Sequence, residues 1–158
     1  MNYYDIIDQI KACFELDDEV ATITHGNITE VDLEDTNIYP LVHMTPTGVS
    51  PNERVKTYSF NIVVMSILDW VTGAESPSTD GIWYGVGSEQ DVLSQMLYIS
   101  ERACNRLRRS PTFKNQNIVL DTYPTMQPFI GDYNNGCAGW TFTLNIQTPS
   151  GDVDNGIC

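Results

Sequence analysis

The sequence contains 158 residues, enough for one domain that buries about two-thirds of its unfolded surface around a single core. Hydrophobic residues make up 41% and charged residues only 18%, so neutral polar side chains supply much of the expected surface. The 8 basic and 21 acidic residues give a net charge of −13, which disfavours specific recognition of a DNA backbone.

No apolar run approaches the roughly 20 residues that span a bilayer, and the segment MNYYDIID lacks the basic and apolar regions of a signal peptide. We therefore expect a soluble, cytosolic protein without membrane contacts. Cys13, Cys104, Cys137 and Cys158 form no CxxC pair, and the first two lie on expected helical faces. This pattern predicts reduced, buried thiols.

The first expected element is an amphipathic helix over residues 2–16, because apolar side chains recur there at helical spacing. The acids that follow, Glu15, Asp17, Asp18 and Glu19, lack the spacing of a calcium-binding loop, so we predict a solvated turn. A short strand is expected over residues 20–28, interrupted by a glycine.

Glu30, Asp32 and Glu34 recur at every second position, so an extended chain would point them the same way, with Asp35 partly opposed. Two interpretations of this acidic stripe stay open. It is either a solvated loop or edge that discourages strand addition, or a negatively charged surface turned toward something that must not adhere to it.

The stretch from Tyr58 to Leu68 predicts a central strand, because its second half is apolar on both faces. Its residues 58–68 would span roughly 36 Å, about twice the usual strand. Residues 39–45 are expected to pair with it antiparallel, through a long connection TPTGVSPNE. We expect this long hairpin to form a projecting arm.

The arm provides candidate subunit contacts at Arg54, Tyr58 and Phe60. Replacing Tyr58 by Ala is expected to impair assembly more than it lowers the melting temperature. Residues 72–87 form a loop rich in Gly, Ser, Thr and Pro that also carries Trp83 and Tyr84. These aromatic side chains either contact a partner or fold back over the core, and the sequence leaves both alternatives open.

The main helix is expected over residues 88–109, where Ser88 and Asp91 resemble a capping box and Pro111 follows the end. Its last turns carry the only basic cluster of the sequence, Arg102, Arg106, Arg108 and Arg109. Because cations stabilise the negative end of a helix dipole, we prefer that role for the cluster over a phosphate site.

Residues 117–123 and 136–147 are expected to be strands of a closing hairpin, with Asn135-Gly136 as its turn signal. In the last strand, apolar side chains from Trp140 to Ile146 alternate with polar ones. The sequence thus predicts a single domain over residues 1–148 and a flexible acidic tail over residues 149–158, with Asp152 and Asp154 as contact candidates.

We find no motif for catalysis or for a cofactor. His25 and His43, the only histidines, lie in or beside expected strands and read as ordinary strand residues. The Cys and His residues lack zinc spacing, and the glycine-containing segments match neither a phosphate loop nor a dinucleotide fingerprint. We therefore expect a non-enzymatic protein with no cofactor and no metal.

The order of helix, strand, long hairpin, major helix and closing strands predicts an α+β fold. Its sheet is expected to be mainly antiparallel around a long central hairpin and packed by one major helix and an N-terminal helix. This plan, with NYYDIIDQI, YPLVHM, YSFNIVVMSIL and GWTFTLNIQ in sequence, resembles the tail terminator and neck ring proteins of tailed bacteriophages.

The resemblance implies a structural virion protein that forms a homo-oligomeric ring, usually a hexamer, which caps the tail tube and joins it to the head. Its partners would be the tail tube protein and neck adaptor proteins, with DNA only as passing cargo. It would be assembled in the host cytoplasm and reside in the virion, at the head–tail junction. Ring lumens in the family are often acidic, which implies a lumen role for Glu30, Asp32, Glu34 and Asp35.

Three alternatives remain. A head-side neck adaptor or stopper belongs to the same structural class. A small metal-dependent hydrolase or nucleotide-binding enzyme would use acids such as Glu30, Asp32 and Asp69. An acidic protein that mimics DNA would instead bind a DNA-binding protein of the host.

Overall fold

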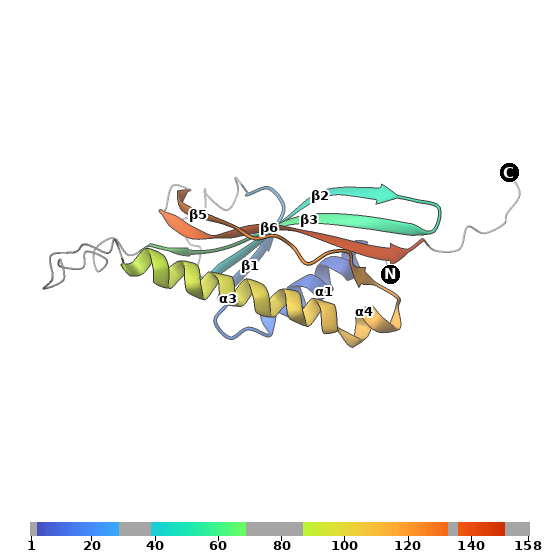
Figure 1. The fold of residues 1–158 in the computed structure, drawn as a ribbon, viewed down its shortest axis with the longest axis horizontal. Coiled ribbons are helices and arrows are strands. Elements are labelled where there is room, and N and C mark those ends of the chain that lie inside the picture. Colours follow the sequence, from blue (N-terminus) through green and yellow to red (C-terminus); the bar gives the residue numbers. More distant parts are fainter. Residues whose placement is uncertain (1–2, 29–38, 69–86, 133–135, 151–158) are drawn as a thin grey trace, which may run out of the picture.

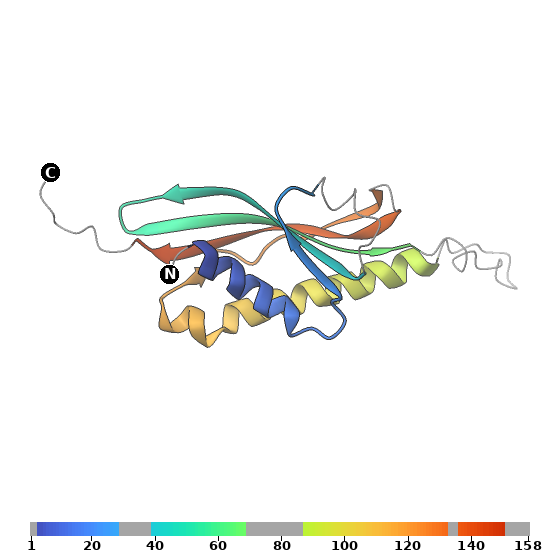
Figure 2. The same ribbon diagram turned by 180° about the vertical axis from the view of Figure 1, so that it is seen from behind.

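The computed structural model describes residues 3–28, 39–68, 87–132 and 136–150. Figure 1 and Figure 2 show that the helices lie together on one side of the sheet. The elements are α1 (Tyr3–Glu15), β1 (Thr22–His25), β2 (Leu41–Pro51), β3 (Val55–Ile67), α3 (Gly87–Arg109), α4 (Pro111–Asn115), β4 (Val119–Leu120), β5 (Gln127–Asp132) and β6 (Cys137–Pro149). The predicted α+β fold is confirmed.

The strands of the described residues form one sheet in the order β1, β2, β3, β6 and β4, with β5 also paired to β6. Only β1 pairs in parallel, with β2; all other pairs are antiparallel. β4 and β5 pair with separate parts of β6, β4 opposite Ile146 and Gln147 and β5 nearer the start of the strand. β3 is the central strand, as its two-sided apolar pattern predicts.

The prediction of a long connection between β2 and β3 is wrong. Most of TPTGVSPNE belongs to β2, which continues to Pro51. The turn is short, and within it Asn52 N donates to Val55 O at 2.8 Å. A bulge between Pro46 and Gly48 adds one residue to β2 opposite β3. The hairpin is therefore long because of its strands and not because of its loop.

β2 accommodates its prolines because their backbone nitrogens point away from β3, toward the other edge of the strand. Gly26 N donates to Met44 O at 3.0 Å, so the backbone polar groups of Met44 point toward the β1 side. Successive residues of a strand point their backbone polar groups alternately to its two sides. With the extra residue of the bulge, the backbone nitrogens of Pro46 and Pro51 both point toward the β1 side, as the backbone of Met44 does. A residue on that edge donates no hydrogen bond to β3, so the missing N–H costs nothing there.

The main core lies between the sheet and the helices. One face of β3 contributes Tyr58, Phe60, Ile62 and Val64 to it, and the facing side of β6 contributes Phe142, Leu144 and Ile146. The helices contribute a further set of buried side chains, namely Ile6, Ile7, Ile10, Cys13, Phe14, Met96, Ile99, Ala103, Cys104, Leu107 and Phe113. Trp140 packs at the edge of this core and donates from Nε1 to Leu93 O at 2.8 Å.

α3 ends at Arg109, before Pro111, as predicted, but the chain then forms a short helix that the sequence analysis missed. In α4, Pro111 occupies the first turn, and Phe113 N donates to the Ser110 side chain at 3.5 Å. Ser followed by Pro is a helix-start signal, which we interpreted only as the end of α3.

The closing hairpin has a different first strand from the one expected. Residues 117–123 contain only the two-residue β4, whereas β5, which includes Pro128, is the strand that precedes β6. Gly136, of the expected turn signal, has a φ of +61°. The predicted tail also starts too early, because Pro149 belongs to β6 and Ser150 N donates to Arg54 O at 2.9 Å.

Candidate functional site

Two of the expected subunit contacts, Tyr58 and Phe60, are core residues. Their side chains are 9% and 0% exposed, respectively, and both lie against Tyr3 of α1. The ring centroids of Tyr3 and Phe60 are 6.0 Å apart in a stacked arrangement, and those of Tyr3 and Tyr58 are 6.3 Å apart. Their end of the strand is covered by α1, so these rings offer a partner almost no surface.

The remaining candidates lie at the hairpin tip or outside the described residues. Arg54 lies in the exposed turn between β2 and β3, with its carbonyl oxygen bonded to Ser150. Trp83, Tyr84, Asp152 and Asp154 fall outside the described residues. The acids Glu30, Asp32, Glu34, Asp35 and Asp69 do so as well, and the proposed lumen and metal roles stay predictions.

The sheet face that points away from the helices carries a surface that the sequence analysis did not select. We call it the open face and define it by Ser59, Asn61, Thr141, Thr143 and Asn145. These residues alternate with the core residues of β3 and β6, so their side chains point to the opposite side of the sheet. All five side chains are neutral and polar, and each is half-buried or exposed.

Hydrogen bonds between neighbouring strands organise the open face. Ser59 Oγ donates to Asn145 Oδ1 at 2.8 Å, and Thr141 Oγ1 donates to Asn61 Oδ1 at 3.2 Å. A cavity of about 360 Å³ lies over these side chains, bounded by the connection from β4 to β5. Its described lining residues carry no charge, so the cavity offers neutral donors and acceptors.

Tyr123 borders this cavity and is 46% exposed. Partial burial raises the pKa of its phenol above the ordinary value, so the hydroxyl stays neutral and able to donate near pH 7. The alternation that buries one face of β6 was visible in the sequence. From the sequence, the opposite face of β6 is recognisable only as polar surface. The pairing with β3 places its side chains beside Ser59 and Asn61 and so forms the open face.

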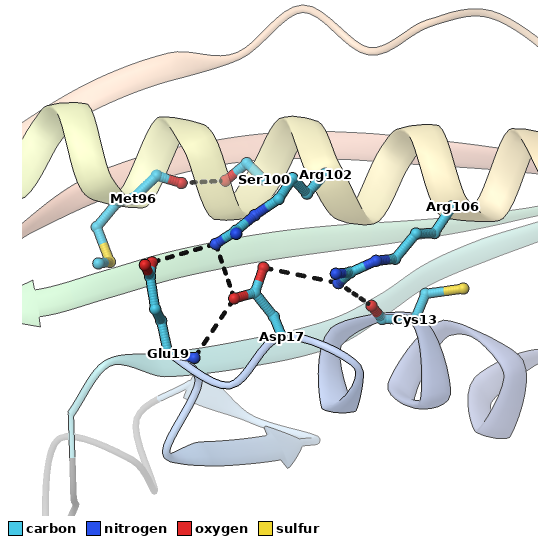
Figure 3. A network of polar contacts seen from close by, with 7 residues as sticks. All are labelled: Cys13, Asp17, Glu19, Met96, Ser100, Arg102 and Arg106. Atoms are coloured by element: carbon cyan, nitrogen blue, oxygen red, sulfur yellow. Dashed lines mark hydrogen bonds and ion pairs between the residues drawn. The ribbon is translucent and has the colours of Figure 1, made fainter.

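The acidic turn after α1 is a second feature that sequence analysis misread. Asp17 is 3% exposed, and its carboxylate lies 2.8 Å from Arg102 Nη2 and 3.6 Å from Arg106 Nη1 (Figure 3). Arg106 also donates to Cys13 O at 3.1 Å, near the end of α1. Asp17 therefore joins α1 to α3, and the expected solvated turn is wrong for this residue.

Arg102 also pairs with Glu19 at 3.1 Å and lies over the Tyr98 ring, 4.2 Å from its centroid. Arg102 and Arg106 thus bind carboxylates from another part of the chain. We predicted that the cluster complements the dipole of its own helix. For Arg102 and Arg106, the ion pairs with these carboxylates are the main interaction instead.

His43 has a structural position in the sheet, as predicted. Its side chain is 1% exposed, with Nδ1 2.7 Å from Thr24 Oγ1 and Nε2 3.2 Å from Gly26 O. These contacts join β2 to β1 and to the residue that follows β1. His25, by contrast, is exposed on β1.

The predicted buried thiols are confirmed for Cys13, Cys104 and Cys137. Burial raises the pKa of Cys13 to about 11 and that of Cys104 to about 12. Both thiols are therefore protonated and weakly nucleophilic at neutral pH.

Within the described ranges, no three His, Cys, Asp or Glu side chains gather closely enough to hold a metal ion. In the same part of the chain, no helix combines the length and the apolar character needed to cross a bilayer.

A second groove lies on the helical side of the molecule. We call it the α1–α3 groove; it has a volume of about 510 Å³. One wall consists of Gln9, Ala12 and Cys13 of α1 and of Leu16, the residue after α1. The opposite wall consists of Arg102, Asn105, Arg106, Arg109, Ser110 and Pro111. The groove thus combines an apolar base with arginine side chains.

No protein-family model matches this chain, and a search of curated proteins returned no match.

Proposed function

We propose that this chain is a structural subunit that assembles into a ring at the head–tail junction of a tailed bacteriophage, where it acts as a tail terminator. Support comes from the order of elements on which the resemblance rests, since α1, the long β2–β3 hairpin, α3 and β6 follow in the expected order. The observation that carries the assembly role is the open face.

The charge of the chain favours a neutral contact surface. Two copies, each with a net charge of −13, repel one another at long range. A contact through charged faces would add the cost of removing those charges from water. The open face avoids the second cost and adds no charge at the contact, because its side chains are neutral and able to hydrogen-bond across an interface.

The sheet also provides the length that a ring wall needs. β3 and β6 contain 13 residues each and pair along their whole length. At about 3.3 Å per residue such a strand is roughly 43 Å long, more than twice the usual strand. The open face occupies only part of this length, because Val63, Met65 and Cys137 farther along the same side of the sheet are buried in a second apolar cluster. The open face is therefore a neutral surface on a long, rigid support.

Assembly is tested with the purified chain, by light scattering and cryo-electron microscopy, alone and on isolated tail tubes. We expect rings, formed either in solution or on the tube end. A protein that stays monomeric and also fails to bind tubes would exclude the proposal. Binding to the portal instead of the tube would identify a head-side adaptor or stopper.

The contact surface is tested by Thr143→Arg, which places a cation on the open face. We expect this variant to lose ring formation and to keep the melting temperature, because Thr143 is exposed in the single chain. The matched control is Ser94→Arg on the exposed side of α3, which adds the same charge on the helical side and should assemble normally. Equal assembly of both variants would show that the open face is not the contact.

The enzymatic alternative has its own test. Calorimetric titration with Mg²⁺, Mn²⁺ and Ca²⁺ detects a carboxylate metal site, since such a site binds at least one of these ions measurably. The DNA-mimic alternative predicts capture of a DNA-binding host protein that is released at high salt.

A further inference from the structure

The α1–α3 groove has an apolar base that is open to solvent. Leu16, directly after α1, is 68% exposed, although it is a large aliphatic side chain. Ala12, Cys13 and Pro111 lie along the same groove. An apolar side chain that entered the groove would remove Leu16 from water, which is worth about 25 cal/mol for each Å² of apolar surface buried.

The charge of the groove is opposite to that of the whole chain. Three of the 8 basic residues, Arg102, Arg106 and Arg109, line it. Arg102 and Arg106 are fixed by Asp17, whereas exposed Arg109 forms no ion pair with any described residue. A carboxylate that entered the groove would find a pre-oriented guanidinium in Arg106 and a free one in Arg109.

The C-terminal end of β6 lies near this groove. A neighbouring cavity of about 540 Å³ is lined by Thr148 and Pro149 of β6 and also by Gln9 and Thr112. Gln9 lines both cavities, and Thr112 follows Pro111 of the groove in sequence. Figure 2 shows the end of β6 beside the start of α1. The chain therefore leaves β6 on the side of the molecule where the groove lies.

We propose that residues 151–158 of the same chain, GDVDNGIC, bind in the α1–α3 groove. The segment alternates acidic and apolar side chains, with Asp152, Val153 and Asp154 in succession and Ile157 close behind. The carboxylates pair with Arg106 and Arg109, and the apolar side chains cover Leu16. Extended, eight residues reach at most roughly 26 Å from Ser150.

Attachment to the same chain strengthens this contact. A segment tethered a few residues away has an effective concentration in the millimolar range, so a weak individual affinity is enough to keep it bound. The inference is independent of ring assembly, because it concerns a contact within one chain.

The test uses the full chain with a nitroxide spin label on Cys158. At pH 7, maleimide chemistry favours this thiol, because Cys13, Cys104 and Cys137 are buried, and mass spectrometry confirms a single label. We expect the amide NMR signals of Leu16 and Arg109 to broaden and disappear. The signal of Ile67, at the far end of β3 from Pro149 in the strand register, should be unaffected.

Charge variants identify the contact. Arg109→Glu should restore the Leu16 signal, and so should Asp152→Asn combined with Asp154→Asn, which leaves every described residue unchanged. The matched control is Arg108→Glu, the same charge change one position earlier on α3, where the side chain lines a different cavity. This control should keep the Leu16 signal broadened.

Two results would overturn the proposal. One is an unchanged Leu16 signal in the labelled full chain. The other comes from mixing spin-labelled chain without ¹⁵N and unlabelled chain with ¹⁵N. Broadening of Leu16 in that mixture as strong as in the singly labelled chain would assign the groove to the segment of a second copy.

Discussion

Arg102 Nη2 and Asp17 Oδ1 are 2.8 Å apart, and this ion pair joins the C-terminal half of α3 to the turn after α1 across a separation of 85 residues in sequence. The carboxylate is 2% exposed, while the arginine side chain keeps 30% of its surface in water. Because a buried carboxylate is costly without a partner, this pair fixes how α1 lies against α3.

We predict that Asp17→Asn lowers the free energy of unfolding by about 2 kcal/mol, because hydrogen bonds to charged groups are worth more than neutral ones. The loss is measured by urea unfolding. Asp18→Asn is the matched control, since Asp18 is the next residue and is exposed. Equal midpoints for the two variants would contradict a structural role for the Asp17 pair.

Phe60→Ala is predicted to destabilise the chain by about 3–5 kcal/mol, because it removes a fully buried ring from the core. Tyr58→Ala should also lower the melting temperature, in contrast to the expectation drawn from sequence. Tyr4→Ala is the control, since Tyr4 is 74% exposed, and should change stability by less than about 1 kcal/mol. A thermal melt of Tyr58→Ala that matches the control would restore the surface role.

Gly139→Ala is predicted to destabilise the sheet by about 2–3 kcal/mol through overpacking. A Cβ atom at Gly139 would overlap the backbone carbonyl group of Val64 on the neighbouring β3, and the backbone there has little room to move. Gly48→Ala is the control, because a Cβ atom at Gly48 meets no atom within 4 Å. Chemical denaturation compares the two variants, and a Gly139→Ala protein as stable as Gly48→Ala would refute the steric argument.

Stability is predicted to fall as the pH rises above about 9. Burial holds the pKa of Cys104 at about 12 and that of Cys13 at about 11, both above the ordinary value of 9.0. A group whose pKa is raised by folding stabilises the native state fully below its unfolded pKa and loses that contribution as the pH passes its folded pKa.

The measurement is the unfolding free energy between pH 8 and pH 11 for the native chain and for Cys104→Ala. The variant lacks one of the buried titrating groups, so its stability should fall less steeply with pH. Identical slopes would mean that the alkaline loss comes from other groups.

The sequence was a good guide wherever a pattern repeats over many residues. The two-sided apolar run of β3 identified the central strand, and the alternation in β6 identified which of its faces is buried. The end of α3 before Pro111 was also predictable, because the residue before a proline disfavours helix. These features depend on local periodicity and on backbone constraints.

Prolines and glycines gave weaker guidance inside the sheet. Pro46, Gly48 and Pro51 indicated a loop, but β2 accommodates them through a bulge and through an edge that donates no hydrogen bond to β3. Pro128 likewise did not prevent β5 from pairing with β6. Whether a proline is compatible with a strand depends on which edge it faces, and that edge is defined only by the neighbouring strand.

The sequence by itself determined the α+β class, the central position of β3 and the burial of its thiols, because hydrophobic periodicity decides which side chains leave water. Only the tertiary structure decided that Asp17 is buried between two arginines, that Tyr58 and Phe60 lie beneath α1, and that the neutral side chains of β3 and β6 form one face. Each of these depends on contacts between residues far apart in the chain, and such contacts leave no periodic signal in the sequence.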